Sequence, residues 1–304
     1  MKRETIVVAA PGRLDLFLAR AFPGMSRQFW KQRIADGSVQ VDAALPRKAD
    51  FQLKGGETVD VTLGADAAPG LDARVIHEDD AILVLDKPSG LIAHPLGTSW
   101  LKTPAALEAE ADSLAGWLWR HRPANRALVR LGIVHRLDQG TSGVMVVAKT
   151  PEAQQSLLDQ FRERKVEKRY RALVAGRIRA KLLKISAAVG RKGHERKISA
   201  DPAGRPALTD VHVLKTATAV SLVEARPKTG RTHQIRVHLA SVGHPVLGDR
   251  EWIQTEAMEK FAAPRLMLHA YRLAFLHPAT GKRAAYEAKL PKEFNACWKR
   301  LAGK

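Results

Sequence analysis

Residues 132–149 read Gly-Ile-Val-His-Arg-Leu-Asp-Gln-Gly-Thr-Ser-Gly-Val-Met-Val-Val-Ala-Lys, and this segment decides how the chain folds around its candidate site. The apolar run Val144–Lys149 predicts a buried strand. The small residues at 140–143 predict a turn before it. Asp138 therefore lies at the lip of a sheet, where a carboxylate can meet a substrate while the strand fixes it. An aspartate in this position also caps turns, so the residues alone leave a purely structural role open.

The segments around this strand mix strands and helices. Residues 73–77 and 81–86 alternate as strands, and Glu78-Asp79-Asp80 between them predicts a hairpin. Because no regular strand–helix–strand repeat is present, the pattern favours an α+β fold with a largely antiparallel sheet. The other elements that we expect are helices over Thr103–Trp119 and Pro151–Arg164, and strands over Tyr170–Val174, Val211–Leu214 and Ser221–Ala225.

The first 64 residues predict a small α/β module of their own. Apolar stripes predict one helix ending at Pro23-Gly24 and a second from Ser26 to Gly37. Residues 65–72 are rich in small residues and predict a linker. We therefore expect a module over residues 1–64, a linker over 65–72 and a larger domain over 73–304.

The composition indicates a polyanionic partner. The 304 residues include 50 Lys and Arg against 31 Asp and Glu, a net charge of +19. Residues 1–70 hold 10 basic and 8 acidic side chains, so +17 of that charge belongs to residues 71–304. Repulsion among so many like charges does not stabilise the fold, so this excess of positive charge favours a nucleic acid as the partner. The basic side chains that we expect to contact such a partner are Arg27, Lys31, Arg191, Lys192, Arg196 and Lys197.

Several other classes of protein are disfavoured. One cysteine, Cys297, excludes an internal disulfide framework and a cysteine-based zinc site. The chain has no phosphate-binding P-loop, no dinucleotide-binding glycine motif, and histidines without metal-ligand spacing. We expect no metal and no cofactor. Neither a membrane span nor a signal peptide is indicated, so we expect a cytoplasmic protein.

Ordered motifs along residues 75–294 resemble those of the large pseudouridine synthase family that includes the ribosomal large-subunit enzymes. The signature is His135-Arg136-Leu137-Asp138 followed by Thr141-Ser142-Gly143. The further matching motifs are Lys87-Pro88-Ser89-Gly90-Leu91, Gln160-Phe161-Arg162, Ala172-Leu173-Val174, Gly230-Arg231-Thr232-His233-Gln234-Ile235-Arg236, Gly243-His244-Pro245 and Leu266-Met267-Leu268-His269-Ala270.

This resemblance implies that uridine in RNA is isomerised to pseudouridine without a cofactor. It implies that Asp138 is the catalytic carboxylate. Asp138 is implied either to attack C1′ of the ribose or to remove a proton from C2′, and both routes remain open. Arg231 is implied to pair with Asp138, and Tyr170 to pack on the base and help remove the C5 proton. Arg136 is implied to occupy the space that the flipped base leaves, and Leu268 to lie beneath the base.

The first module resembles the S-four-type RNA-binding module of a small-subunit ribosomal protein and some tRNA synthetases. Arg13-Leu14-Asp15, Ser26-Arg27 and Gly37-Ser38-Val39 carry this resemblance, although Val41-Asp42-Ala43 replaces the usual Val-Asn-Gly. It implies a basic helix face against RNA. We expect a monomer whose target is large-subunit ribosomal RNA or else transfer RNA. The alternatives are a non-catalytic RNA-binding or ribosome-assembly factor and, third, an RNA glycosidase or nuclease.

Overall fold

The structure is a computed structural model that describes most of the chain. The described residues are 2–22, 25, 27–35, 37–46, 48–63, 71–95, 107, 113–192, 197–200, 203–249, 251 and 262–303. They form two compact units, of which the first comprises residues 1–71 and 91–133 and the second comprises residues 72–90 and 134–304. The expected linker over 65–72 lies mostly outside the described residues, so the boundaries of the expected module and domain stay predictions.

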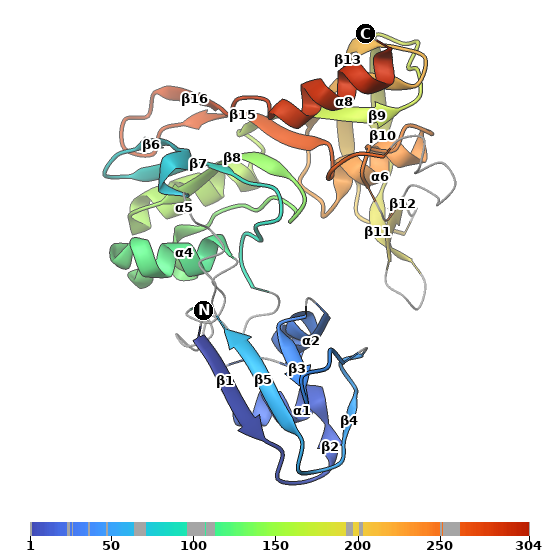
Figure 1. The fold of residues 1–304 in the computed structure, drawn as a ribbon. Coiled ribbons are helices and arrows are strands. Elements are labelled where there is room, and N and C mark those ends of the chain that lie inside the picture. The colour runs from blue at the N-terminus through green and yellow to red at the C-terminus, as the bar shows by residue number, and fades with distance from the viewer. Residues whose placement is uncertain are drawn as a thin grey trace. The chain divides into compact units, whose positions relative to one another are not determined.

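The first unit begins with a small α/β fold whose sheet has the strand order β1-β5-β3 (Figure 1). Its elements are β1 (Lys2–Val7), β2 (Gly12–Arg13), α1 (Leu14–Ala21), α2 (Arg27–Ala35), β3 (Val39–Val41), β4 (Gln52–Leu53) and β5 (Thr58–Leu63). The two helices lie where the apolar stripes predict them. Leu14, Leu18 and Trp30 are fully buried and pack with Val39 and Val59, so the helices cover one core.

The described residues 114–132 of the first unit are mostly helical. It contains α4 (Leu114–His121), η3 (Pro123–Ala127) and η4 (Val129–Gly132). The Ser113 side chain accepts a hydrogen bond from the backbone N–H of Gly116 at 2.9 Å and thereby caps the start of α4. Of the helix expected over Thr103–Trp119, the part before residue 113 lies outside the described residues, apart from Leu107.

One long sheet organises the second unit, with the strand order β10-β13-β14-β9-β15-β8-β7-β6 and with β16 paired to β15 (Figure 1). Neighbours are antiparallel except β15 and β8, which pair in parallel through His269–Ser142 and Ala270–Gly143. The α+β fold with a largely antiparallel sheet is confirmed. The strands are β6 (Val75–Glu78), β7 (Ile82–Lys87), β8 (Ser142–Ala148), β9 (Glu167–Ala175), β10 (Leu182–Ser186), β13 (Leu208–Thr216), β14 (Val220–Pro227), β15 (Leu268–Leu276) and β16 (Arg283–Glu287).

The parallel contact between β8 and β15 depends on a glycine. Gly143 has φ of +120°, and a Cβ at this position would lie 2.1 Å from the carbonyl oxygen of Ala270. No other residue type fits so close an approach. Beside it, the buried Ser142 hydroxyl and His269 Nδ1 form a hydrogen bond of 2.9 Å. The segment that follows the Asp138 loop is thus hydrogen-bonded to a strand far along the sequence.

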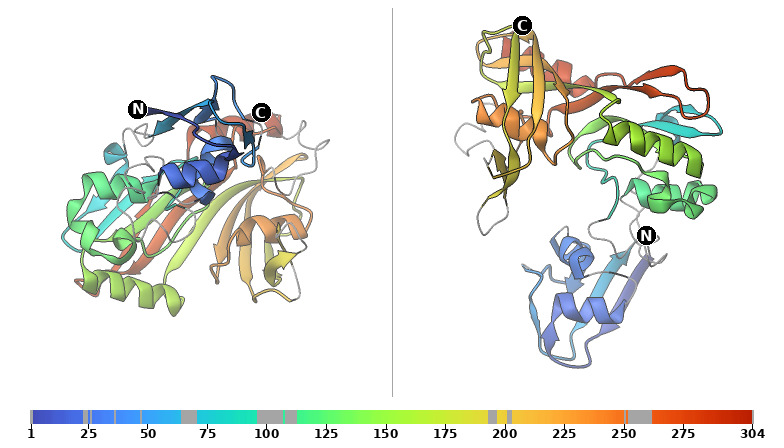
Figure 2. Two further views of the ribbon diagram at one scale, coloured as in Figure 1. Left: turned by 90° about the horizontal axis from the view of Figure 1, so that it is seen from below. Right: turned by 180° about the vertical axis from the view of Figure 1, so that it is seen from behind.

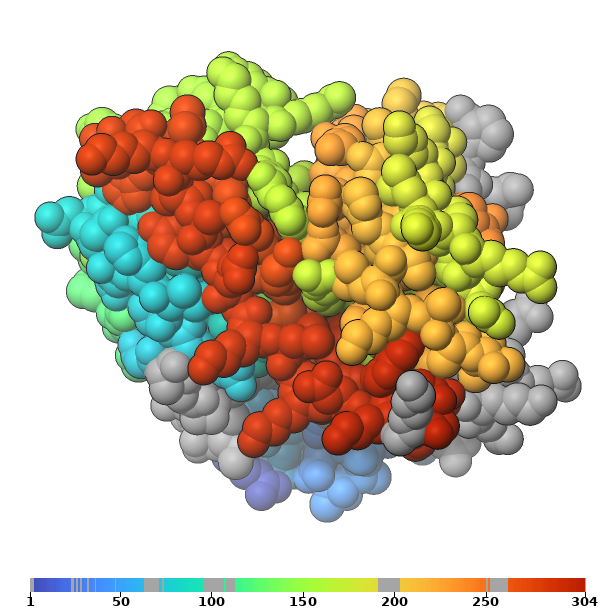
Figure 3. Space-filling model, turned by 90° about the horizontal axis from the view of Figure 1, so that it is seen from above, coloured from blue at the N-terminus to red at the C-terminus, as the bar shows by residue number. Residues whose placement is uncertain are grey.

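Two separate cores lie on the two halves of this sheet. The helices are α5 (Pro151–Arg162), α6 (Gln234–Ser241) and α8 (Lys292–Ala302), and a small hairpin joins β11 (Val189–Lys192) to β12 (Lys197–Ala200). Val146 and Leu157 belong to the core between β8 and α5, whereas Val223 and Leu239 belong to the core between β14 and α6 (Figure 2). In the space-filling view the two halves touch through the middle of the molecule, and a furrow lies between them toward one edge (Figure 3).

Candidate active site

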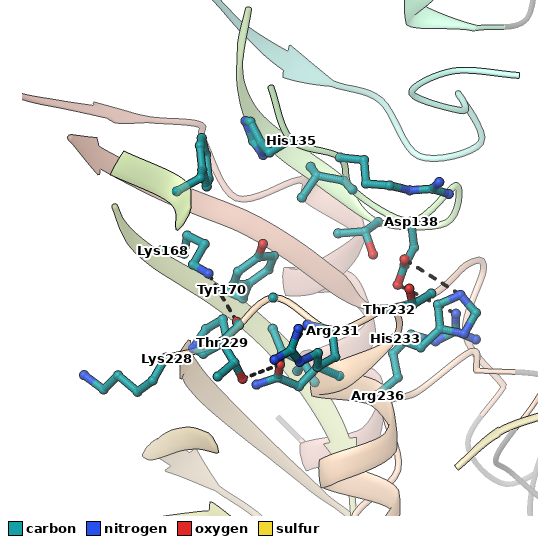
Figure 4. Close-up of a pocket in the computed structure, with 18 of the residues that line it drawn as sticks. His135, Asp138, Lys168, Tyr170, Lys228, Thr229, Arg231, Thr232, His233 and Arg236 are labelled. Atoms are coloured by element: carbon teal, nitrogen blue, oxygen red, sulfur yellow. Dashed lines mark hydrogen bonds and ion pairs between the residues drawn. The ribbon is translucent and has the colours of Figure 1, made fainter. Parts of the chain in front are cut away.

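A pocket of about 550 Å³ lies in the second unit, between the two halves of its sheet. It is lined by the loop after η4, the end of α5, β9, the segment between β14 and α6, and the start of β15 (Figure 4). Four residues expected from the sequence, Asp138, Tyr170, Arg231 and Leu268, all line it, as does Arg136. The fold therefore brings together residues that are up to 132 positions apart, Arg136 and Leu268.

Asp138 lies in a tight turn just before β8. Its carbonyl oxygen accepts a hydrogen bond of 3.0 Å from the backbone N–H of Thr141, and its side chain keeps an exposed fraction of 21%. Its two carboxylate oxygens face Arg236 Nη1 and His233 Nε2, each at 3.8 Å. These distances exceed a hydrogen bond, so the charge is balanced while the oxygens stay accessible.

The Asp138 loop is fixed by hydrogen bonds from the end of β7 and from the residues that follow this strand. Lys87 is fully buried, and its Nζ donates to the carbonyl oxygen of Gln139 at 3.3 Å. The Ser89 hydroxyl donates to the carbonyl oxygen of Gly140 at 2.7 Å, and the Gly90 N–H donates to that of Gln139 at 2.8 Å. Burial lowers the pKa of Lys87 to about 7, although the nearby charge of Asp138 opposes this change. The physical role of this motif is to fix the loop.

Arg236 is the best-fixed cation in the pocket. Its Nε and Nη2 donate to the two carboxylate oxygens of Asp249 at 2.6 and 2.7 Å, and its side chain has an exposed fraction of 9%. Burial alone would lower the pKa of Arg236, but the hydrogen bonds and charge of Asp249 raise it overall. A planar guanidinium held in this way offers its remaining edge to Asp138 as a permanent positive charge.

Tyr170 and Leu268 form the wall and floor of the pocket on neighbouring strands. Tyr170 lies on β9, where burial and the charge of Asp138 raise the pKa of its phenol, so the phenol is protonated at neutral pH. Leu268 opens β15, is buried, and pairs in register with Ala172 of β9. An aromatic ring beside an apolar floor is a surface on which a nucleobase can stack.

Known proteins share this arrangement of sequence and fold. A model of the RNA pseudouridylate synthase family matches residues 81–241, more than half of the chain. The chain belongs to this family. It is 38% identical to ribosomal large subunit pseudouridine synthase D of Neisseria meningitidis serogroup A, over 93% of this chain and 76% of that protein. It is also 38% identical to an uncharacterized RNA pseudouridine synthase of Aquifex aeolicus, over 94% of this chain and 92% of that protein.

Solved structures agree with the fold of this pseudouridine synthase. Human RNA pseudouridylate synthase domain containing 4 has a TM-score of 0.58 at 24% identity, over 77% of this chain and 95% of that one. Human RNA pseudouridylate synthase domain containing 1 has a TM-score of 0.54 at 26% identity, over 76% of this chain and 95% of that one. The protein is an RNA pseudouridine synthase, an isomerase that converts uridine within RNA into pseudouridine.

In this synthase Arg236 faces Asp138 at 3.8 Å, and the expected pairing of Arg231 with Asp138 stays a prediction. Arg231 lines the pocket, but its Nε faces the carbonyl oxygen of Pro206 at 3.5 Å. The physical reason is where α6 begins. Arg231 precedes the helix, whereas Arg236 lies in its first turn, where Asp249 holds it toward Asp138. Both arginines stand in one motif, so only the fold distinguishes them.

Two further pocket residues of the synthase have no expected role from the sequence. His135 is partly buried; its Nε2 accepts a hydrogen bond of 3.0 Å from the Val146 N–H, and its ring stacks on Phe161 with ring centroids 4.7 Å apart. Burial, with a contribution from Lys168, lowers the pKa of His135 to about 3, so its ring is neutral. Lys168 points to the carbonyl oxygen of Thr229 at 3.2 Å. Basic residues are frequent here, and none of these patterns singled out either side chain.

The other expected RNA contacts lie outside this pocket. Arg27 and Lys31 are on α2, and Arg27 Nε donates to Asp15 at 2.7 Å. Arg191 and Lys192 end β11 and Lys197 begins β12, so the cluster belongs to a hairpin. Arg196 and the side chains of the other three lie outside the described residues. Within the described part, no helix is long and apolar enough to cross a bilayer.

Proposed function

We propose that this synthase isomerises uridines of large-subunit ribosomal RNA, with Asp138 as its catalytic carboxylate. The observation that carries the proposal is that Asp138 is the one acidic side chain among the described residues that line a strongly basic pocket. The similarity to ribosomal large subunit pseudouridine synthase D of Neisseria meningitidis supports the choice of RNA. Transfer RNA is the alternative substrate.

The reaction exchanges one bond for another within a single nucleotide. The N1–C1′ bond breaks, the detached uracil turns, and C5 bonds to C1′; C5 then loses its proton and N1 gains one. Breaking the glycosidic bond develops positive charge at C1′, which an ionised carboxylate stabilises or attacks, as in retaining glycosidases. Removal of the C2′ proton by the same carboxylate also needs the ionised form. The cationic side chain of Arg236 lies 3.8 Å from this carboxylate.

The other pocket residues position the nucleotide. A uridine must leave its stack to reach Asp138, which costs a few kcal/mol. Arg136 precedes Asp138 by two residues and fills the vacated space. Tyr170 stacks on the uracil and takes part in removal of the C5 proton, with Leu268 beneath the base. Arg231 contacts the substrate from the wall of the pocket, while Arg236 orients the carboxylate.

The proposal extends to the rest of the chain. Residues 1–64 form an RNA-binding module of the S-four type, joined by a linker over 65–72 to a catalytic domain over 73–304. Arg27, Lys31 and the β11–β12 hairpin add phosphate contacts. The chain acts as a monomer in the cytoplasm, where its ribosomal RNA substrate is found.

The test maps pseudouridine in cells with and without the gene. We expect specific sites in large-subunit ribosomal RNA to lose pseudouridine, and the purified enzyme to restore them in an unmodified transcript. A loss confined to transfer RNA would move the substrate to that class. If no RNA changes and the purified protein still binds ribosomal RNA, a non-catalytic role replaces the proposed one.

A further inference from the structure

The pocket has two chemically different ends. Asp138, His233 and Arg236 lie together at one end, Lys168 and Lys228 lie toward the other, and Tyr170 stands between (Figure 4). Among the described residues that line the pocket, seven are lysine or arginine. The end away from Asp138 therefore has a surplus of positive charge that the chemistry at C1′ does not use.

Three of these seven cations, Arg162, Lys228 and Arg236, have a carboxylate within 4.0 Å. Arg162 lies 2.7 Å from Asp159, and Lys228 lies 3.5 Å from Asp210. In contrast, neither Arg164 nor Lys168 has a carboxylate within 4.0 Å among the described residues, and Lys168 Nζ donates to the neutral carbonyl oxygen of Thr229 at 3.2 Å. Burial, with a contribution from the charge of Arg164, lowers the pKa of Lys168 to about 8. The two cations repel each other, and Lys168 is partly buried whereas Arg164 is exposed.

The backbone at Arg164 is a second, independent observation. Helix α5 ends in two hydrogen bonds, from the Lys165 N–H to the Gln160 carbonyl oxygen at 2.9 Å and from the Arg164 N–H to that of Phe161 at 3.3 Å. This Schellman geometry places Arg164 in the left-handed region, with φ of +60°. Glycine is the favoured residue there, because a side chain strains that conformation. The helix end alone does not explain an arginine at this position, and such strain is concentrated at functional sites.

We propose that Arg164 and Lys168 form a phosphate site at the end of the pocket opposite Asp138, and that it binds a backbone phosphate next to the flipped uridine. This inference rests on the proposed RNA substrate. A phosphate relieves the repulsion between the two cations, and a guanidinium can bind two of its oxygens at once. Because this phosphate site binds the RNA backbone while Tyr170 and Leu268 contact the base, the site fixes the position of C1′ relative to Asp138.

Arg164→Gly separates this role from a structural one. Glycine suits the left-handed backbone, so we expect a melting temperature at or above that of the wild type together with weaker binding of a large-subunit ribosomal RNA transcript. The slope of log affinity against log salt should fall by roughly 0.7 to 0.9 for the lost contact. Lys168→Met should flatten the slope equally, and Lys168→Arg should preserve it. Lys282→Met is the matched control, because it removes one charge from the exposed turn between β15 and β16.

Chemically altered RNA identifies the phosphate. In a synthetic strand around a mapped uridine, single methylphosphonates remove one charge at a time. We expect one position to weaken binding by the wild type about tenfold and to have no further effect in Arg164→Gly or Lys168→Met. If the wild type forms pseudouridine but no position shows this coupling, and both variants keep the wild-type salt slope, the phosphate site is wrong while the proposed function stands. If the wild type forms no pseudouridine in ribosomal RNA, the proposed function fails first.

Discussion

The tripeptide Arg-Leu-Asp occurs in each of the two units, and the two copies have opposite surroundings. In the first unit Asp15 has an exposed fraction of 0%, and its oxygens accept hydrogen bonds from Arg13 at 3.1 Å and from Arg27 at 2.7 Å. In the second unit Asp138 has an exposed fraction of 21%, and its cations stand 3.8 Å away. A carboxylate whose oxygens are fully occupied stabilises a fold. One whose charge is balanced at a distance keeps its oxygens for a substrate.

The two copies also differ in the contacts that hold the aspartate in place. Asp15 lies in the first turn of α1, where its own hydrogen bonds hold it in place. Asp138 has no such bonds among the described contacts of its carboxylate, and its loop is fixed through backbone carbonyl groups by Lys87, Ser89 and Gly90. The reactive carboxylate is thus positioned without its oxygens being used.

The largest expected effect is that of Asp138→Asn. We expect a loss of pseudouridine formation of roughly a thousandfold or more, because an amide neither attacks C1′ nor takes a proton. RNA affinity should stay within several-fold and the melting temperature should not fall. A single-turnover assay measures the loss, with mass spectrometry to exclude deamidation of the new asparagine. Wild-type turnover by the intact variant would remove Asp138 from the mechanism.

Asp15→Asn should give the opposite pattern. It leaves Arg13 and Arg27 without their partner, so the free energy of unfolding should fall by about 2 kcal/mol, less than for a fully buried pair because both arginines are partly exposed. Activity at saturating RNA should be unchanged. Burial would raise the pKa of Asp15, but the two arginines lower it overall. The contribution is therefore present above pH about 4 and lost below it, and the variant should lack this part of the acid sensitivity.

Arg136→Ala tests whether the arginine of the second tripeptide acts on the substrate. We expect the rate at saturating RNA to fall by about tenfold, because the vacated stack is no longer filled. The salt slope of binding should change little. Replacing Arg191, Lys192, Arg196 and Lys197 by alanine should instead flatten the slope and leave the saturated rate unchanged. An Arg136→Ala enzyme that binds like the cluster variant and turns over normally would make Arg136 a phosphate contact only.

Lys87→Met should have the smallest effect on rate, about a few-fold, because Ser89 and Gly90 still hold the loop. The clearer effect of this substitution is on how the free energy of unfolding depends on pH. The pKa of Lys87 is about 7 in the folded protein, below its ordinary value, so the unfolded chain binds more protons between pH about 7 and 10. This group makes stability rise with pH over that range. Chemical denaturation at several pH values should show a smaller rise in the variant, and identical curves would contradict the assigned burial.

Local patterns predict much of this enzyme. Alternating and apolar runs predict the antiparallel sheet, and the family resemblance implies a site that includes Asp138, Tyr170 and Leu268. The contact of Arg236 with Asp138 could not be predicted from the sequence, because it depends on where α6 begins and on Asp249, which is not adjacent in sequence. The contact of Lys87 with the Asp138 loop could not be predicted either, since the acceptor in that loop is a backbone carbonyl 52 positions away. Contacts between distant backbone groups leave no mark on side-chain patterns.

The lock between Ser142 and His269 has a consequence during protein synthesis. These residues lie 127 positions apart, and β15 supplies both the neighbour of β8 and the Leu268 floor. At roughly 5 to 20 residues per second, a ribosome leaves β8 without this neighbour for roughly 6 to 25 s. For that time the nascent chain holds Asp138 but no complete pocket, and an apolar strand edge is open to wrong pairing. The enzyme therefore becomes able to modify RNA only after β15 has been synthesised and has paired with β8.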